Sequence, residues 1–207
     1  MKKHILITGS TDGIGKLAAI SFAKEGHTVY IHGRNTEKVN ATIAEIKSLS
    51  TEAEINGFVA DLSDLKAVRQ MSAQVIEQVK KLDVLINNAG VFKSAMAKCT
   101  AGYDLRFTVN YLAPYLLTKQ LLPLLSKSSD ARIINLSSAA QSELSYEAMM
   151  GRNNVTVNAA YAQSKLALTM WSFDLAKKED KLLVIAVNPG SLLHTKMATE
   201  AYGQYWS

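Results

Sequence analysis

The sequence predicts an α/β protein built on one doubly wound parallel β-sheet. Two observations lead to this fold class. Short apolar runs rich in β-branched residues alternate with longer segments of helical period, and the runs are mostly continuous, as strands covered on both faces are. Strand followed by helix, repeated along the chain, is typical of a doubly wound sheet with right-handed crossovers. No internal repeat, low-complexity segment or flexible linker divides the 207 residues, so we expect a single domain.

The expected elements follow one another in a regular order. The predicted strands are Ile5 to Thr8, Thr28 to His32, Ile55 to Val59, Val84 to Asn87, Arg132 to Leu136 and Leu183 to Val187. The predicted helices between them are Ile14–Lys24, Thr36–Leu49, Leu65–Lys80, Tyr103–Leu125 and Ala160–Lys177. Asp64 or Ser63 can cap the third helix and Thr36 or Asn35 the second, because such side chains accept hydrogen bonds from the free N–H groups of a first turn.

Composition and charge narrow the class of protein. With 48% hydrophobic and 20% charged residues, the chain suits a soluble domain that can bury a core without disulfides. Cys99 is the single cysteine, which fits a reducing compartment, so we expect a cytoplasmic protein. The four histidines show no metal-ligand spacing, and the net charge of +5 is spread among acids, so neither a metal site nor a nucleic-acid surface is expected. No stretch approaches the ~20 apolar residues of a membrane span.

The first predicted strand runs into a glycine-rich turn, and a helix follows. Glycine lets the backbone turn tightly and lets a pyrophosphate approach the helix N-terminus, where free N–H groups and the helix dipole favour anions. The glycine-rich segment could instead be an ordinary connecting loop, but the strand before it and the helix after it favour a dinucleotide-binding turn. Its expected cofactor-binding residues are Gly9, Ser10, Thr11, Asp12, Gly13, Ile14 and Gly15.

The residues after the second strand indicate which dinucleotide binds. An NAD-binding unit usually has an acidic side chain here that holds the ribose 2′-OH. This chain has Gly33 followed by Arg34 and Asn35, which leaves room for a 2′-phosphate that a guanidinium can bind with paired charged hydrogen bonds. Arg34 could instead be an ordinary surface arginine. With the glycine-rich turn beside it, we expect NADP(H) as the cofactor.

Tyr161 and Lys165 form the candidate acid–base pair. Positions four apart share one face of a helix, so Lys165 is expected beside the Tyr161 ring. A phenol has a pKa near 10, and a neighbouring ammonium lowers it by stabilising the phenolate. A tyrosine followed by a lysine at this spacing is common by chance, so the pair gains meaning only from its context.

Together these motifs resemble the short-chain dehydrogenase/reductase family, and the resemblance covers nearly the whole chain. It implies a Rossmann fold and hydride transfer between a nicotinamide cofactor and a small-molecule ketone, aldehyde or alcohol; Arg34 indicates that this cofactor is NADP(H). It adds four groups of residues to the candidate site. Asp61 and Leu62 match the pair that contacts adenine, and Asn88, Ala89 and Gly90 match the motif after the fourth strand. Ser138 matches the catalytic serine and Asn110 the helix asparagine, and Pro189, Gly190 and Thr195 match the segment that closes over the nicotinamide.

The resemblance also implies the role of each catalytic residue. Tyr161 exchanges a proton with the substrate oxygen, and Ser138 donates a hydrogen bond to that oxygen. Lys165 lowers the tyrosine pKa and holds the nicotinamide ribose, so the cofactor site includes both Tyr161 and Lys165. Asn110 passes protons to Lys165 through water. The resemblance further implies a homodimer or homotetramer.

Two departures from the family pattern stand out. The segment between Ser138 and Tyr161 is longer than in the usual member, which is similar to the retinol-dehydrogenase-like branch, whose substrates are often apolar. Little follows Gly190, and nothing there reads as another strand. We therefore expect a sheet without the usual seventh strand, and a single domain over residues 1–207 whose substrate-covering part is cut short.

Two other functions fit part of the pattern. A non-catalytic NADP(H)-binding redox sensor or interaction protein needs the fold but not all of Asn110, Ser138, Tyr161 and Lys165. An epimerase or dehydratase of the extended branch has a longer chain and a different glycine spacing. The complete set of four therefore favours the oxidoreductase.

Overall fold

Six parallel strands form the sheet of the computed structural model, which describes residues 1–190 and Thr199. The strands are β1 (His4–Ile7), β2 (Thr28–Gly33), β3 (Ile55–Val59), β4 (Val84–Asn87), β5 (Arg132–Leu136) and β6 (Leu183–Val187). Their order across the sheet is β3-β2-β1-β4-β5-β6, and every neighbouring pair runs parallel. The predicted doubly wound parallel sheet is confirmed.

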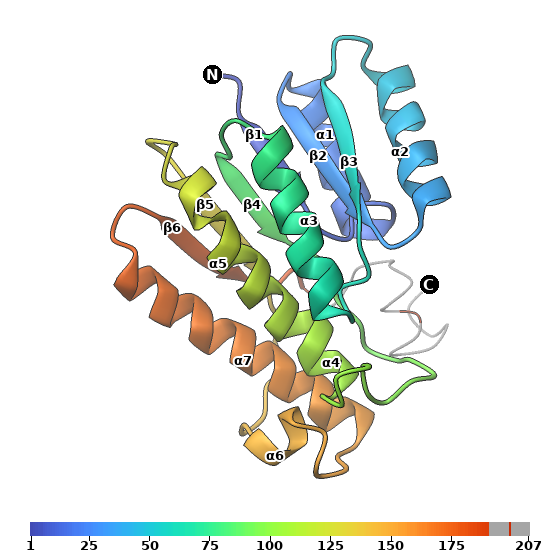
Figure 1. Ribbon diagram of the computed structural model, residues 1–207, viewed down its shortest axis with the longest axis vertical. Helices are drawn as coiled ribbons and strands as arrows, with labels where there is room; N and C mark the ends of the chain where they lie inside the picture. The colour runs from blue at the N-terminus through green and yellow to red at the C-terminus, as the bar shows by residue number, and fades with distance from the viewer. Residues whose placement is uncertain (191–198, 200–207) are drawn as a thin grey trace.

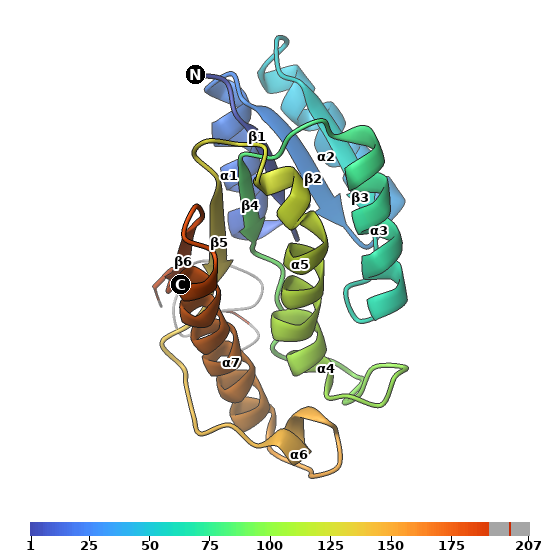
Figure 2. The same ribbon diagram turned by 60° about the vertical axis from the view of Figure 1, so that its left-hand side comes forward.

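Helices cover both faces of this sheet. Figures 1 and 2 show α3 (Leu65–Gln78), α5 (Ala113–Leu125) and α7 (Val157–Lys178) as a layer against one face. The other face packs against α1 (Gly13–Lys24) and α2 (Thr36–Leu49). Three short elements, α4 (Leu105–Phe107), the π-helix η1 (Thr108–Leu112) and α6 (Tyr146–Met149), lie beyond the carboxyl ends of the strands.

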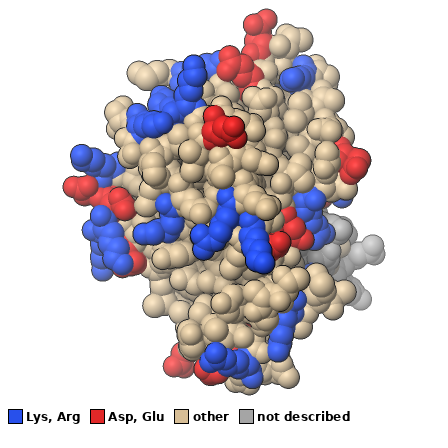
Figure 3. All heavy atoms as spheres, in the orientation of Figure 1, with Lys and Arg blue, Asp and Glu red and all other residues tan. Residues whose placement is uncertain are grey.

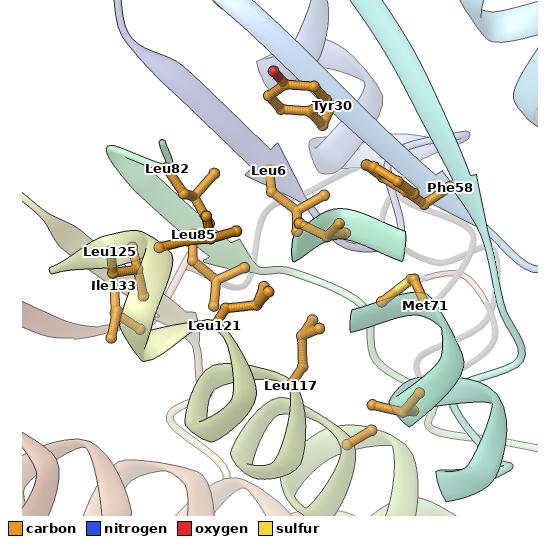
Figure 4. Packing of buried hydrophobic residues seen from close by; sticks show 14 of the residues in the cluster. Leu6, Tyr30, Phe58, Met71, Leu82, Leu85, Leu117, Leu121, Leu125 and Ile133 are labelled. Atoms are coloured by element: carbon orange, nitrogen blue, oxygen red, sulfur yellow. The ribbon is translucent and has the colours of Figure 1, made fainter. Parts of the chain in front are cut away.

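Each face of the sheet has its own apolar core, because successive strand residues point to opposite faces. Leu6, Leu85 and Ile133 face α3, α5 and α7, where Figure 4 shows Leu117 and Leu121 packed against the strands. The neighbouring strand residues face α1 and α2 instead, and these include Ile5, Ile7, Val29, Ile31 and Ile86. A strand buried on both sides must be apolar at consecutive positions, which explains the continuous runs in the sequence.

The caps confirm two of the predicted helix starts. The side chain of Asn35 accepts a hydrogen bond from the N–H of Lys38 at 2.8 Å, and that of Asp64 accepts one from Lys66 at 2.8 Å. Each bond satisfies an N–H group that has no partner within the helix.

The single helix predicted over Tyr103–Leu125 is wrong in its interior and at its start. The chain forms α4, the π-helix η1 and α5 in succession. The helix begins only at Leu105, because the Asp104 carboxylate accepts hydrogen bonds from the N–H groups of Arg106 and Phe107 and so caps it. A π turn keeps the helical run of apolar residues, so residue periodicity did not reveal it. The short helix α6 also lies in a segment expected to be a loop.

Strand β6 is an edge strand in the described part of the sheet, and its residues Leu183 and Ile185 are exposed by 49% and 37%. None of the described helices is both long and apolar enough to cross a lipid bilayer. On the face drawn in Figure 3, acidic side chains lie among the lysines and arginines.

Candidate active site

The candidate residues gather where the parallel strands end. Because all six strands run the same way, their carboxyl ends meet at one edge of the sheet. The chain winds outward in opposite directions from β1 and β4, which lie side by side at the centre. Such a switch point is where open α/β sheets bind their ligands.

Two glycines allow the turn between β1 and α1. Gly9 has a φ of 62°, and a Cβ at this position would lie 2.8 Å from the Cα of Ala89. A Cβ on Gly15 would lie 2.5 Å from the carbonyl oxygen of Gly9. Asp12 caps α1 by accepting a hydrogen bond from the N–H of Gly13. This bare backbone at a helix N-terminus fits a pyrophosphate group, which needs N–H donors at close approach.

Thr8 and Asn88 fasten this turn to the loop after β4. The Thr8 hydroxyl accepts hydrogen bonds from the N–H groups of Asn88 and Ala89, both at 3.1 Å. The Asn88 side-chain amide donates to the carbonyl oxygens of Thr8 at 2.9 Å and Gly9 at 2.8 Å. The structure therefore brings the predicted residues Asn88 and Ala89 against Gly9, with half-buried Gly90 next in the chain.

The end of β2 exposes Arg34 beside the turn. Gly33 is needed there for packing, because a Cβ would lie 2.7 Å from the Thr11 methyl group and 3.0 Å from that of Val39. Arg34 is exposed and forms no ion pair with a described residue, so its guanidinium is available to an anion. Asn35 is also exposed, but its side-chain oxygen caps α2.

Asp61 and Leu62, the pair expected at the adenine, differ in their surroundings. Asp61 is exposed after β3, and its carboxylate accepts a hydrogen bond from the N–H of Ser63 at 2.8 Å. Leu62 is 5% exposed and belongs to the core against α3 and α5. Of the two side chains, that of Asp61 is the accessible one, and Leu62 anchors the segment.

Sequence reasoning missed His32, which lies between the turn and the end of β3. Its Nδ1 accepts a hydrogen bond from the N–H of Gly9 at 3.1 Å, and its Nε2 lies 3.0 Å from the carbonyl oxygen of Ala60. Burial lowers the pKa of His32 to about 4, against a smaller opposing effect of the Ala60 carbonyl and Asp61. The sequence gives only a weak signal for a role of His32, which is its place at the end of the second predicted strand, one residue before Gly33.

Tyr161 and Lys165 lie together on α7, as their spacing predicts. The Lys165 ammonium is 5.8 Å from the centre of the Tyr161 ring, and the rings of Phe92 and Tyr161 meet edge-on with their centres 5.0 Å apart. Lys165 is 4% exposed and donates a hydrogen bond to the carbonyl oxygen of Leu136 at 2.6 Å. Burial lowers the pKa of Lys165 to about 8.

The two serines after β5 have separate surroundings. Ser137 is buried, and its hydroxyl donates to the carbonyl oxygen of Lys165 at 3.2 Å and lies 2.6 Å from the Thr169 hydroxyl. Ser138 is half-buried, and its hydroxyl oxygen accepts a hydrogen bond from the N–H of Ala140 at 3.1 Å. Ser137 therefore fixes β5 to α7, while Ser138 keeps its hydroxyl proton to donate.

Asn110 lies in η1 and joins the loop after β4 to α7. Its side-chain oxygen accepts from the N–H of Val91 at 2.7 Å, and its amide donates to the Val91 carbonyl oxygen at 3.0 Å. The amide also donates to the Ser164 hydroxyl at 2.9 Å, which donates in turn to the carbonyl oxygen of Tyr161 at 2.7 Å. No hydrogen bond joins Asn110 to Lys165 within the described residues, so the predicted proton relay stays a prediction.

Only part of the predicted segment after β6 is described. Pro189 is half-buried, and Gly190 is exposed with a φ of 90°. The N–H of Gly190 donates to the side-chain oxygen of Asn188 at 3.2 Å. Thr195 lies outside the described residues.

The two long loops beside the site contact each other through Asp104 and its neighbours. The N–H of Asp104 donates to the carbonyl oxygen of Met149, which is in α6. The Asp104 carboxylate pairs with the guanidinium of Arg106 at 2.6 Å, and both side chains are nearly buried. Arg106 also donates to the carbonyl oxygen of Ala97. The loop before α4 and the long segment between β5 and α7 are therefore held side by side.

Comparison with known proteins places this chain in a family. Residues 3–206 match the family of short chain dehydrogenases. Human retinol dehydrogenase 13 is 34% identical over 193 residues, which are 91% of this chain and 58% of that protein. Mouse retinol dehydrogenase 12 is 36% identical over 195 residues, 92% of this chain and 62% of that protein. The chain thus spans about three fifths of the length of these curated relatives.

Solved structures give the same result for the fold. A Shigella flexneri structure described as a short chain dehydrogenase complexed with NADP aligns with a TM-score of 0.80 at 28% identity, covering 98% of this chain and 82% of that one. An Escherichia coli structure described as a short chain dehydrogenase complexed with NADPH aligns with a TM-score of 0.80 at 29% identity, with the same coverage.

Proposed function

Because the chain belongs to the short-chain dehydrogenase family, in its retinol-dehydrogenase-like branch, we propose that it is an NADP(H)-dependent oxidoreductase acting on a carbonyl or alcohol group. The observation that carries this proposal is the buried ammonium of Lys165 beside the Tyr161 ring, at the carboxyl end of β5. A buried ammonium without a carboxylate partner among the described residues is costly, and its position beside a phenol favours the ionised form of that phenol.

The side chains have distinct tasks in this mechanism. NADPH, when bound, supplies the hydride. Tyr161 gives its phenolic proton to the substrate carbonyl oxygen during reduction and takes it back during oxidation. The Lys165 ammonium stabilises the phenolate that remains. Ser138 donates its hydroxyl proton to the same substrate oxygen and stabilises the charge that develops there.

Several contacts hold this catalytic group in place. Lys165 is fixed by the carbonyl oxygen of Leu136, and its own carbonyl oxygen accepts from Ser137. Asn110 and Ser164 tie the start of α7 to the loop after β4. Such fixed geometry is what hydride and proton transfer need, because misplacement by an ångström lowers the rate steeply.

Removal of the Tyr161 hydroxyl tests the enzymatic function. We expect Tyr161→Phe to abolish turnover of a carbonyl panel with NADPH, a loss of at least about a hundredfold, because the general acid is gone. NADPH affinity should stay close to that of the wild type, since the ring is retained. Tyr115→Phe, on α5, is the matched control and should keep full activity. Tight NADPH binding without turnover in the wild type would instead favour the non-catalytic redox sensor.

Arg34 carries the proposed preference for NADP(H). An exposed guanidinium with no carboxylate partner among the described residues suits a 2′-phosphate. Arg34→Ala should weaken NADPH binding about tenfold or more and leave NADH binding nearly unchanged, measured by fluorescence titration. Lys38→Ala, in the first turn of α2, is the control for a general loss of positive charge. Equal losses for both cofactors would show that Arg34 does not bind the phosphate.

The proposed substrate is apolar, and the proposed oligomeric state is a homodimer or homotetramer. Two relatives are named retinol dehydrogenases, so the carbonyl panel should include long apolar aldehydes such as retinal. A homodimer or homotetramer is supported by exposed apolar side chains on α7, where Phe173 is 65% and Met170 53% exposed. Light scattering in solution would decide it, and a monomer would contradict it. The cytoplasmic location stays a prediction.

A further inference from the structure

His32 joins three strand ends that surround the proposed cofactor site. It is 2% exposed, so its contacts are shielded from water. Its backbone N–H donates to the Ser10 hydroxyl at 2.8 Å, and its carbonyl oxygen accepts from the N–H of Ser10 at 2.9 Å. The imidazole adds contacts to Gly9 on one side and Ala60 on the other. Gly9 begins the glycine-rich turn, and Ala60 precedes Asp61.

The two partners of the imidazole determine its protonation. The N–H of Gly9 can only donate, so Nδ1 must carry a lone pair. The carbonyl oxygen of Ala60 can only accept, so Nε2 must carry the proton. The neutral Nε2–H tautomer satisfies both contacts, whereas an imidazolium would direct an N–H group at the N–H of Gly9. Asp61 is the charged group that acts on His32 from the end of β3.

We propose that His32 is a positioning residue for the cofactor, acting as a neutral bridge that holds the glycine-rich turn against the end of β3. The inference rests on the proposed function, since it takes the turn to be the pyrophosphate site. A displacement of Gly9 would shift the whole turn, because the carbonyl oxygen of Gly9 accepts a hydrogen bond from the Asn88 amide and lies against Gly15. Through Ala60, the same side chain sets the start of the segment that contains Asp61.

Two amide side chains can separate the two contacts. The Asn side-chain oxygen falls near the position of Nδ1, so His32→Asn keeps an acceptor for the N–H of Gly9. The Gln amide nitrogen falls near the position of Nε2, so His32→Gln keeps the donor to Ala60 and loses the bond to Gly9. His32→Leu removes both. His4→Asn is the control, because His4 meets Tyr30 at the opposite end of the sheet.

NADPH affinity of these variants, measured by fluorescence titration, is the first readout. His32→Asn should bind NADPH within about threefold of the wild type, and His32→Gln and His32→Leu should bind about tenfold more weakly, the effect of one lost hydrogen bond. The control should match the wild type. Equal affinity in the wild type and His32→Gln would overturn the proposal. So would a loss in His32→Asn as large as in His32→Gln, because the Gly9 contact would then be irrelevant.

The wild type without cofactor gives the second readout. The imidazole ¹⁵N shifts should show the Nε2–H tautomer at neutral pH, and the N–H of Gly9 should exchange slowly with deuterium and faster in His32→Gln. An Nδ1–H tautomer, or a Gly9 N–H equally protected in both proteins, would overturn the proposal. These measurements separate the two proposals: a protein that keeps the tautomer and the protected N–H but binds no NADPH would contradict the proposed function, and with it the role of His32 toward the cofactor, while the neutral bridge between Gly9 and Ala60 would stand.

Discussion

At the scale of single residues, the candidate site contains a buried lysine, Lys165, whose charge is costly to the folded protein. Its ammonium is surrounded by protein and has the Leu136 carbonyl oxygen as its hydrogen-bond partner. Burial of a cation penalises the charged form, and the pKa of Lys165 falls from 10.5 to about 8. At about 1.4 kcal/mol for each tenfold change in proton affinity, the folded protein loses about 3 kcal/mol by keeping this lysine charged at neutral pH.

The pH dependence of stability follows from that difference. The folded pKa is below the unfolded one, so between about pH 8 and 10.5 the unfolded chain binds more protons and stability rises with pH. We expect Lys165→Met to be more stable than the wild type at pH 7, with the difference narrowing as the pH approaches 10. Urea unfolding at several pH values measures this. A constant difference would show that Lys165 titrates normally in the folded protein.

At the scale of elements, a buried ion pair joins the loop before α4 to its helix. The Asp104 and Arg106 side chains are only 11% and 5% exposed, and Asp104 also caps α4. Arg106 reaches back to the carbonyl oxygen of Ala97, while the N–H of Asp104 binds Met149. The pair thus determines how the two segments beside the site lie against each other, at the expense of burying two charges.

Removal of one partner should be costly. Arg106→Leu leaves the Asp104 carboxylate buried without its cation, and we expect a loss of about 3–5 kcal/mol in the free energy of unfolding. Arg132→Leu is the matched control, because its pair with Asp130 is about half exposed and should contribute at most about 1 kcal/mol. Urea unfolding of both variants compares them directly, and similar losses would contradict the assigned role of the buried pair.

At the scale of the whole molecule, the sequence predicted the sheet and the main helices well. A strand covered on both faces is continuously apolar, so the six strands could be predicted from runs such as Val84 to Asn87. The start of α2 could be predicted because the cap involves only Asn35 and Lys38, three residues further along the chain. Contacts between distant segments could not be predicted. His32 bonds to residues 23 and 28 positions away, and only the completed sheet brings them together.

The same distinction applies to the candidate site. Tyr161 and Lys165 were predicted as neighbours because helical spacing is local, and the structure places them so. Leu62 was expected at the cofactor, and its contact there stays a prediction. Its side chain is buried in the core, which the pattern did not reveal because it identifies a segment and not the direction of each side chain. Asn110 was expected as a relay, which stays a prediction. It makes its hydrogen bonds to Val91 and Ser164 from within the π turn, which residue periodicity does not reveal.

That π turn, η1, determines how α5 is rotated about the helix axis relative to α4, which precedes it in the same helical run. η1 contains one residue more per turn than an α-helix, so α4 and α5 are offset from a continuous helix by about 100° about the axis and about 1.5 Å along it. The offset lets Leu117 and Leu121 of α5 point into the core while Asn110 points at the loop after β4. The extra residue therefore lets one helical run contact the candidate site through Asn110 and the interior through Leu117, two residues seven positions apart that a regular helix would place on nearly the same face.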